Sequence, residues 1–226
     1  MTAPAASQEA PAWQMWTLYA AALAVPALPP LPKTRQTVLD LARCLFDSDF
    51  LGPTGALAAA TVALSVGVGF LPVSGRAAGP GTVATGAAVS VIAVCAALVQ
   101  PRAGRALDDG RLITRTGIIA GLLTAAIGVA SAMLPGLTGV LVGAALIGTG
   151  TGVITPLGFA ALTASTPSER LGQAMGAAEL VRELGDAGGP LLVAAVATLT
   201  RGYVALAALL AGGAAVGFVH RRSGAA

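Results

Sequence analysis

Four ionisable residues, Glu179, Arg182, Glu183 and Asp186, stand at positions i, i+3, i+4 and i+7 of one otherwise apolar run. This spacing places all four on one face of a helix, where Arg182 can pair with Glu179 or with Asp186. The carboxylates left over from that pair could take up a proton and bias the helix between two arrangements, as in a gate or a proton-linked element. The simpler alternative, which we place first, is a static charge network that braces the helix.

The element that carries this face is one of seven long apolar runs joined by short polar segments. Hydrophobic residues make up 55% of the 226 residues and charged residues 10%, a balance that suits lipid better than a water-exposed surface. A helix crosses the hydrocarbon core in about 20 residues, and most runs reach or nearly reach that length. The sequence predicts an all-α polytopic membrane protein with seven transmembrane helices: Trp13–Leu31, Phe50–Val73, Thr82–Gln100, Leu112–Leu134, Leu137–Ala164, Gly172–Thr200 and Tyr203–Val219.

Basic residues predict the orientation of these spans. Ten of the thirteen Lys and Arg residues lie in alternate polar segments, namely residues 32–49, 101–115, 165–171 and the carboxyl-terminal tail. The positive-inside rule therefore places the carboxyl terminus in the cytoplasm and the amino terminus outside, in a multi-pass protein of the plasma membrane. The first run is interpreted as a retained span and not as a signal peptide, because no Lys or Arg precedes it.

The charged face cannot lie wholly outside the bilayer. If it did, the helix would cross with only Ala187–Thr200, roughly 20 Å against the ~30 Å that is needed. Part of the face is therefore expected at membrane depth, turned toward protein or a water-filled crevice.

Other chemistries find no support in the residue types. A metal site, a cofactor site or an enzyme active site is not expected, because the chain has one histidine, His220, and two isolated cysteines, Cys44 and Cys95. The sole lysine, Lys33, lies in a polar segment, where it could not hold retinal inside a bundle. The net charge of +3 comes from scattered residues without interleaved aromatics, so a nucleic-acid partner is not expected either.

Small residues at every fourth position predict where helices pack closely. Gly148, Gly152 and Pro156 follow this spacing, and so do Gly172 and Gly176. Because lipid offers no hydrophobic force between helices, such residues allow the backbones to approach each other.

The polar segment between the third and fourth runs carries the most specific motif, Gln-Pro-Arg-Ala-Gly-Arg-Ala-Leu-Asp-Asp-Gly-Arg at residues 100–111. It resembles the cytoplasmic signature Gly-Arg-x-x-Asp-Arg-x-Gly-Arg of the major facilitator superfamily of transporters. The chain departs from the signature in having Asp109 where a basic residue is usual and in being one residue shorter before the second glycine. The matching residues, which the resemblance makes a cytoplasmic gate motif, are Gly104, Arg105, Asp108, Gly110 and Arg111.

Further stretches are similar to the same family. Residues 148–156, 166–176 and 179–190 resemble the tenth helix, the following loop and the eleventh helix of such transporters, so that the likeness covers about residues 13–222. It implies a polar tail (1–12), a helix that resembles the sixth (13–32), a cytoplasmic linker (33–49), a carboxyl-terminal six-helix bundle (50–222) and a short tail (223–226). Helices one to five of the family would then be missing.

The resemblance implies secondary transport of a small molecule across the membrane, with efflux of a drug-like molecule as the expected activity. Protons are a candidate partner through the surplus carboxylates of the charged face, and the sequence does not identify the driving ion. The alternative is a non-transporting remnant, or a half-transporter that needs a partner half or self-association. The resemblance places several residues along the substrate cavity. For most of them the simpler interpretation is that the hydroxyl donates a hydrogen bond to a carbonyl of its own helix. These substrate-lining candidates are Thr61, Ser65, Thr149, Thr151, Thr155 and Phe159.

Overall fold

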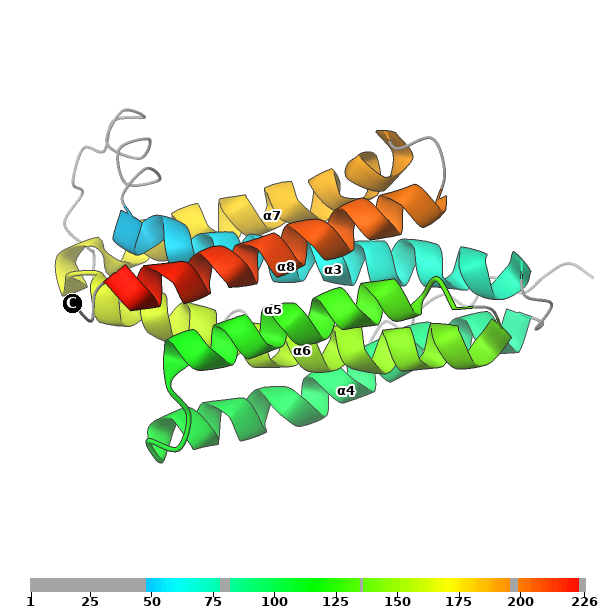
Figure 1. Cartoon of the computed structure of the whole chain (residues 1–226). Coiled ribbons are helices and arrows are strands. Elements are labelled where there is room, and N and C mark those ends of the chain that lie inside the picture. Colours follow the sequence, from blue (N-terminus) through cyan, green and yellow to red (C-terminus); the bar gives the residue numbers. More distant parts are fainter. Residues whose placement is uncertain (1–47, 78–81, 135, 196–198, 224–226) are drawn as a thin grey trace, which may run out of the picture. The chain divides into compact units, whose positions relative to one another are not determined.

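The computed structural model describes residues 48–77, 82–134, 136–195 and 199–223, and in these residues the fold is all-α (Figure 1). The predicted first span, Trp13–Leu31, and the linker up to residue 47 lie outside the described residues. One 3-10 turn, η1 (Ser168–Arg170), precedes α7. The α-helices are α3 (Ser48–Ala77), α4 (Thr82–Asp108), α5 (Thr114–Ser131), α6 (Gly136–Ser165), α7 (Leu171–Ala195) and α8 (Leu199–Ser223).

Four of these helices are long and apolar enough to cross a membrane, which identifies a candidate multi-pass membrane protein. The segments are Phe50–Val73, Gly86–Asp108, Thr114–Ser131 and Gly136–Ser165. The seven predicted spans are therefore shown only in part. α7 and α8 are helices of 25 residues each, but α7 carries the four charges, and in α8 only Val204–Ala214 forms a shorter apolar stretch.

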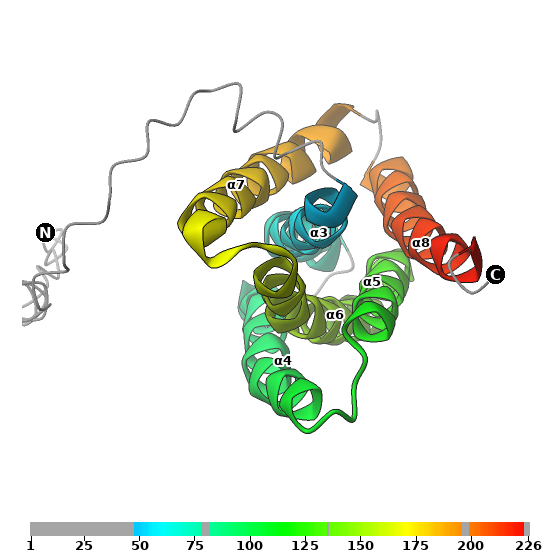
Figure 2. The ribbon, with the colours of Figure 1, turned by 90° about the vertical axis from the view of Figure 1, so that its left-hand side faces the viewer.

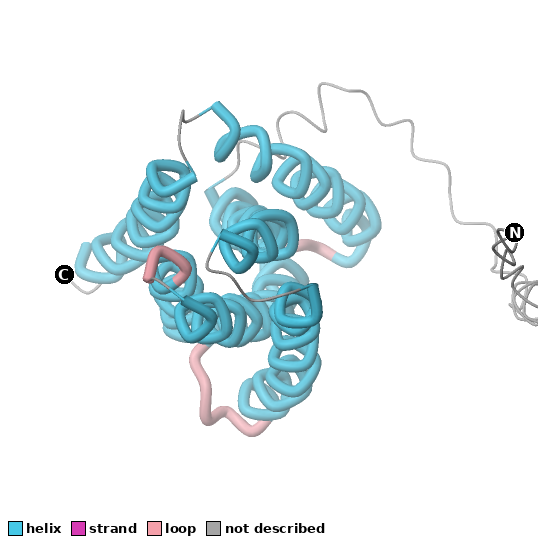
Figure 3. The backbone as a smooth tube through the Cα atoms, turned by 90° about the vertical axis from the view of Figure 1, so that its right-hand side faces the viewer, coloured by secondary structure: helices cyan, strands magenta, loops and turns pink. Residues whose placement is uncertain are grey.

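α3 is the central helix of the bundle. It packs against each of the other five helices, and it lies between them in the two end-on views (Figures 2 and 3). α6 lies along both α4 and α5, α8 packs on α5, and α7 packs chiefly on α3. Leu57, Val66 and Leu71 of α3 are fully buried against this surround.

α5 and α6 are joined along a seam of small residues. A Cβ atom on Gly128 would lie 2.7 Å from the backbone nitrogen of Ile147, and a Cβ on Gly143 would lie 2.8 Å from the carbonyl oxygen of Gly128. Gly121 and Gly150 form a second close approach further along, because a Cβ on Gly150 would lie 2.6 Å from the carbonyl oxygen of Gly121. Backbone contact of this kind is how helices gain packing energy in lipid.

The predicted role of glycines in packing holds for α6 but not for the start of α7. Gly148 lies against the carbonyl oxygen of Ile92 in α4, and a Cβ on Gly152 would lie 3.1 Å from the Cα atom of Ala96. At Gly172 and Gly176, however, an added Cβ would meet no atom of the described residues within 4 Å, so close packing against another described helix is not found there. These two glycines lie in the first turns of α7, where the helix has open space on their side.

Large apolar side chains are exposed on the outside of every described helix. They include Val94 in α4, Ile127 in α5, Leu184 in α7 and Leu209 in α8. A bundle that is apolar on its outside as well as in its core is suited to lipid rather than to water.

Candidate functional site

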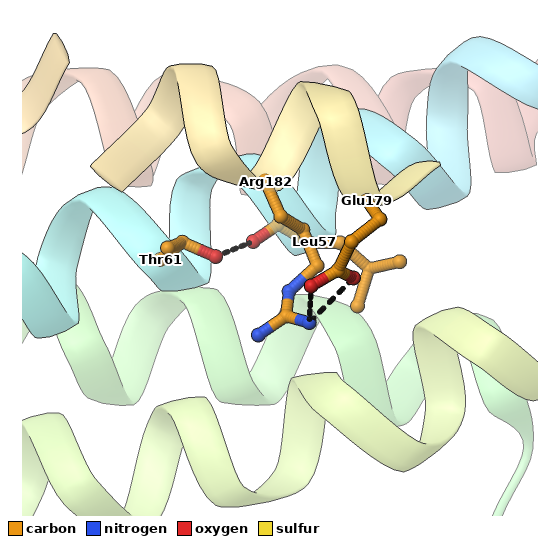
Figure 4. A network of polar contacts seen from close by, with 4 residues as sticks. All are labelled: Leu57, Thr61, Glu179 and Arg182. Atoms are coloured by element: carbon orange, nitrogen blue, oxygen red, sulfur yellow. Dashed lines mark hydrogen bonds and ion pairs between the residues drawn. The ribbon is translucent and has the colours of Figure 1, made fainter. Parts of the chain in front are cut away.

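The charged face predicted on α7 is organised around Arg182. Its Nη1 atom donates to both carboxylate oxygens of Glu179, at 2.8 Å and 3.1 Å. The spacing allowed Arg182 to pair with Glu179 or with Asp186, and in the structure it pairs with Glu179, on its amino-terminal side. Long side chains in a helix lean toward its amino terminus, which explains the choice. Figure 4 shows this pair on α7 next to Leu57 and Thr61 of α3.

A second contact of Arg182 reaches α6. The guanidinium carbon lies 5.7 Å from the centre of the Phe159 ring, a cation–π distance. Phe159 itself packs on a small apolar cluster made by α3, α6 and α7, which includes Leu57, Leu162 and Ala178. The Arg182 side chain is consequently only 29% exposed, whereas that of Glu179 is 52% exposed.

The other two carboxylates of the face, Glu183 and Asp186, are exposed. Within the described parts of the chain, neither forms an ion pair: the pairs found there are Arg182 with Glu179 and Arg111 with Asp109. Glu183 and Asp186 are thus the surplus charges that the sequence predicted.

Two glycines place α7 directly against the candidate span of α3. A Cβ on Gly185 would lie 2.7 Å from the carbonyl oxygen of Ala58, and a Cβ on Gly189 would lie 3.1 Å from that of Val62. Since both contacts advance by four residues in the same direction, the two helices run parallel. The four-residue spacing of these two glycines is visible in the sequence and could have indicated this contact, which was not predicted.

This register gives the position of the charged face along the candidate span of α3. Ala58 lies eight residues beyond Phe50, where the candidate span begins, or about 12 Å along the helix axis. Arg182 precedes Gly185 by three residues and Asp186 follows it by one, so they lie about 8 Å and about 14 Å from the level of Phe50. The charged face therefore extends alongside the candidate span of α3.

Most of the substrate-lining candidates bond to their own helix. Thr61 donates to the carbonyl of Leu57, Thr151 to that of Ile147 and Thr155 to that of Thr151, each at 2.9 Å. Ser65 donates to Val62 at 3.2 Å. These bonds agree with the simpler of the two interpretations, in which the hydroxyls serve their own helix.

The candidates lie on two helices, α3 and α6. Thr151 is buried, and Thr149 is half-buried on the same helix. Ser65 lies in the contact between α3 and α7, because a Cβ on Gly189 would lie 2.6 Å from its hydroxyl oxygen. Phe159 contacts the charged face directly, through Arg182.

The residues of the gate motif form the end of α4 and the turn that follows it. The N–H of Arg111 donates to the carbonyl of Ala106 at 2.9 Å, and the N–H of Gly110 donates to that of Leu107 at 3.0 Å. With Gly110 at φ +68°, this is a Schellman motif, the usual way in which a glycine ends a helix. Gly110 therefore has a structural role that requires no transport function.

The described ion pair of the motif joins Asp109 to Arg111. Asp109, the residue that departs from the family signature, lies 3.6 Å from Nη1 of Arg111. Asp108 is exposed and makes no ion pair with the residues that the structure describes. The Arg111–Asp109 pair is 80% and 53% exposed, so it contributes little to stability.

Two glycines of the motif should respond oppositely to the same substitution. Gly110→Ala forces alanine into the left-handed region, which we expect to destabilise the end of α4 by about 1 kcal/mol. Gly104→Ala adds a Cβ within α4 that meets nothing within 4 Å, and it should stabilise the helix by up to about 1 kcal/mol. Thermal unfolding of both variants in detergent measures the difference. Equal shifts in Tm would contradict the role given to Gly110.

The gate motif and the start of α7 lie at the same end of the bundle. Because successive helices alternate in direction, this end also holds the start of α3 and the connection from α6 to α7 (Figure 1). The exposed arginines gather there, at positions 102, 105, 111, 115 and 170, whereas Arg201 lies near the other end.

Comparison with protein-family models gives no match, and no curated protein matches the chain in sequence. The resemblance to major facilitator transporters accordingly rests on the motif residues quoted above.

Proposed function

We propose that this chain works in the transport of a small, drug-like molecule across the plasma membrane, as a secondary transporter of the major facilitator type. The observation that carries the proposal is the charged face of α7, which runs beside a candidate span to about 14 Å from the end of that span. Ionisable groups at such depth are costly in lipid, so they are kept chiefly where they serve a pathway or a conformational change.

The proposal includes the full topology. Trp13–Leu31, α7 and α8 would join the four candidate spans to make seven, with the arginine-rich end of the bundle in the cytoplasm. The gate motif would then lie on the cytoplasmic side, where Asp108 is free of the described charges and available to a partner segment. Transport would proceed by rocking of helix groups around a central site.

Protons are the proposed coupling ion because Glu183 and Asp186 carry charge that Arg182 does not neutralise. Protonation of these carboxylates would lower the cost of exposing α7 to lipid, and would thereby favour one arrangement of the helix over another. Thr61, Thr149, Thr155 and Phe159 remain the proposed contacts of the substrate, together with Ser65 and Thr151.

The test uses the purified full chain in liposomes, with a pH gradient and a fluorescent quaternary ammonium dye as substrate. The dye carries a fixed charge, so it does not accumulate along the gradient as a neutral amine would, and protein-free liposomes give the baseline. The parent should accumulate the dye, and the double variant Glu183→Gln/Asp186→Asn should lower the gradient-driven rate by roughly tenfold or more. Glu169→Gln is the matched control, because Glu169 is an exposed carboxylate in η1, outside the candidate spans. Equal rates for the double variant and the control would refute proton coupling through α7.

The alternative function is a half-transporter that needs a second half or a second copy. The exposed charged face favours it, because carboxylates at membrane depth call for a polar or protein surround. Absence of dye accumulation by the parent alone, together with chemical crosslinking of two chains in native membranes, would support this alternative. Accumulation by a chain that remains monomeric would exclude it.

A further inference from the structure

The contact between Arg182 and Phe159 has a consequence for how α7 is held. α7 rests on α3 through Gly185 and Gly189, which bring the two backbones into contact. Glycines have no side chains to interlock with ridges on the other helix. This contact therefore fixes the separation of the helices more firmly than the rotation of α7 about its own axis.

The rotation of α7 needs contacts with further helices, and both α6 and α8 pack on it. The polar contact with α6 is made by Arg182, which emerges from α7 one turn before Gly185 and whose guanidinium lies on the Phe159 ring. Glu179 accepts from Nη1 of the same guanidinium, at 2.8 Å. A planar cation that contacts both a carboxylate and an aromatic ring is restricted in position and orientation.

We infer that Arg182 is a positioning residue that ties α7 to α6 and sets the rotation of α7, holding Glu183 and Asp186 on the exposed face. This goes beyond the proposed function and does not depend on it, since it concerns the position of a helix and not the movement of a substrate. Asp186, four residues after Arg182, offers a second partner for the guanidinium. Moving to Asp186 would take Arg182 off the ring and leave the small apolar cluster as the remaining described contact between α6 and α7.

Distance measurements between spin labels test this tie directly, in the full chain with Cys44→Ala and Cys95→Ala, reconstituted in liposomes. One label on Leu184 of α7, which is 72% exposed, is paired with a label on the exposed Thr163 of α6. The reference pair leaves α7 out and joins Thr163 to Leu51 of α3, which is 56% exposed.

Phe159→Leu removes the ring and keeps an apolar side chain. It should raise the population of a second α6–α7 distance by roughly tenfold, while the α3–α6 reference stays as in the parent. Phe159→Tyr, which keeps an aromatic face, should restore the parent distribution. If Phe159→Leu gives no folded protein, Phe159→Met applies the same test.

Two results would overturn the inference. An α6–α7 distribution unchanged by loss of the ring would show that Arg182 does not hold α7 there. Equal broadening of both distances would show that Phe159 is a packing residue of the small apolar cluster and no more. Neither result bears on dye accumulation, so the proposed function is tested separately.

Discussion

Replacing Gly150 with alanine should destabilise the folded bundle by about 3 kcal/mol, at the upper end of the usual cost of overpacking. The added Cβ would lie 2.6 Å from the carbonyl oxygen of Gly121 and 2.7 Å from the backbone nitrogen of Ala125. Both atoms belong to the backbone of α5, so no side chain can rotate to make room. The two helices must separate along their seam and lose contact energy over several turns.

Gly188→Ala is the control for this substitution. An added Cβ at Gly188 in α7 meets nothing within 4 Å, so the variant should gain up to about 1 kcal/mol from helix propensity. Thermal unfolding in detergent should therefore shift Tm downward for the first variant and slightly upward for the second. A Tm for Gly150→Ala at or above that of the parent would show that α5 and α6 do not meet as described.

The second large effect is expected from Arg182→Gln. The substitution leaves Glu179 without its cation and places three carboxylates on one face of α7. A fully buried unpaired carboxylate would cost more, but Glu179 is about half exposed. We therefore expect Arg182→Gln to lower the free energy of unfolding by about 2 kcal/mol.

A double-mutant cycle isolates the pair. Glu179→Gln/Arg182→Gln removes both charges, and it should be less destabilised than the sum of the single variants, by about 1 kcal/mol. The quantity to measure is the free energy of unfolding in mixed micelles for the parent and the three variants. Strict additivity would mean that the contact seen between Glu179 and Arg182 carries no energy.

The sequence predicted the long apolar helices well, because composition over 18 or more residues decides whether a helix can lie in lipid. The run Phe50–Val73 coincides with the first candidate span. The end of α4 was predicted less well. The predicted span ended at Gln100, yet the helix continues to Asp108, and the Schellman motif at Gly110 ends it.

The candidate site was predicted only as far as one helix reaches. The spacing of the four charges is a local property of α7, so their common face could be read from the sequence. The contact of Arg182 with Phe159 could not, because these residues lie on different helices and the rotation of each helix decides whether they meet. The same holds for Gly185 and Ala58, whose contact sets the position of the charged face along the candidate span of α3.

The most direct test of the membrane arrangement is labelling of two single cysteines by an impermeant maleimide in intact cells, with Cys44 and Cys95 replaced. Asp109 lies at the arginine-rich end of the bundle, and Leu134, which is 59% exposed, lies at the other end. The two variants are Asp109→Cys and Leu134→Cys. The account predicts that Leu134→Cys is labelled in intact cells and that Asp109→Cys is labelled only after the membrane is permeabilised. Labelling of neither site, or of Asp109→Cys alone, in intact cells would contradict it.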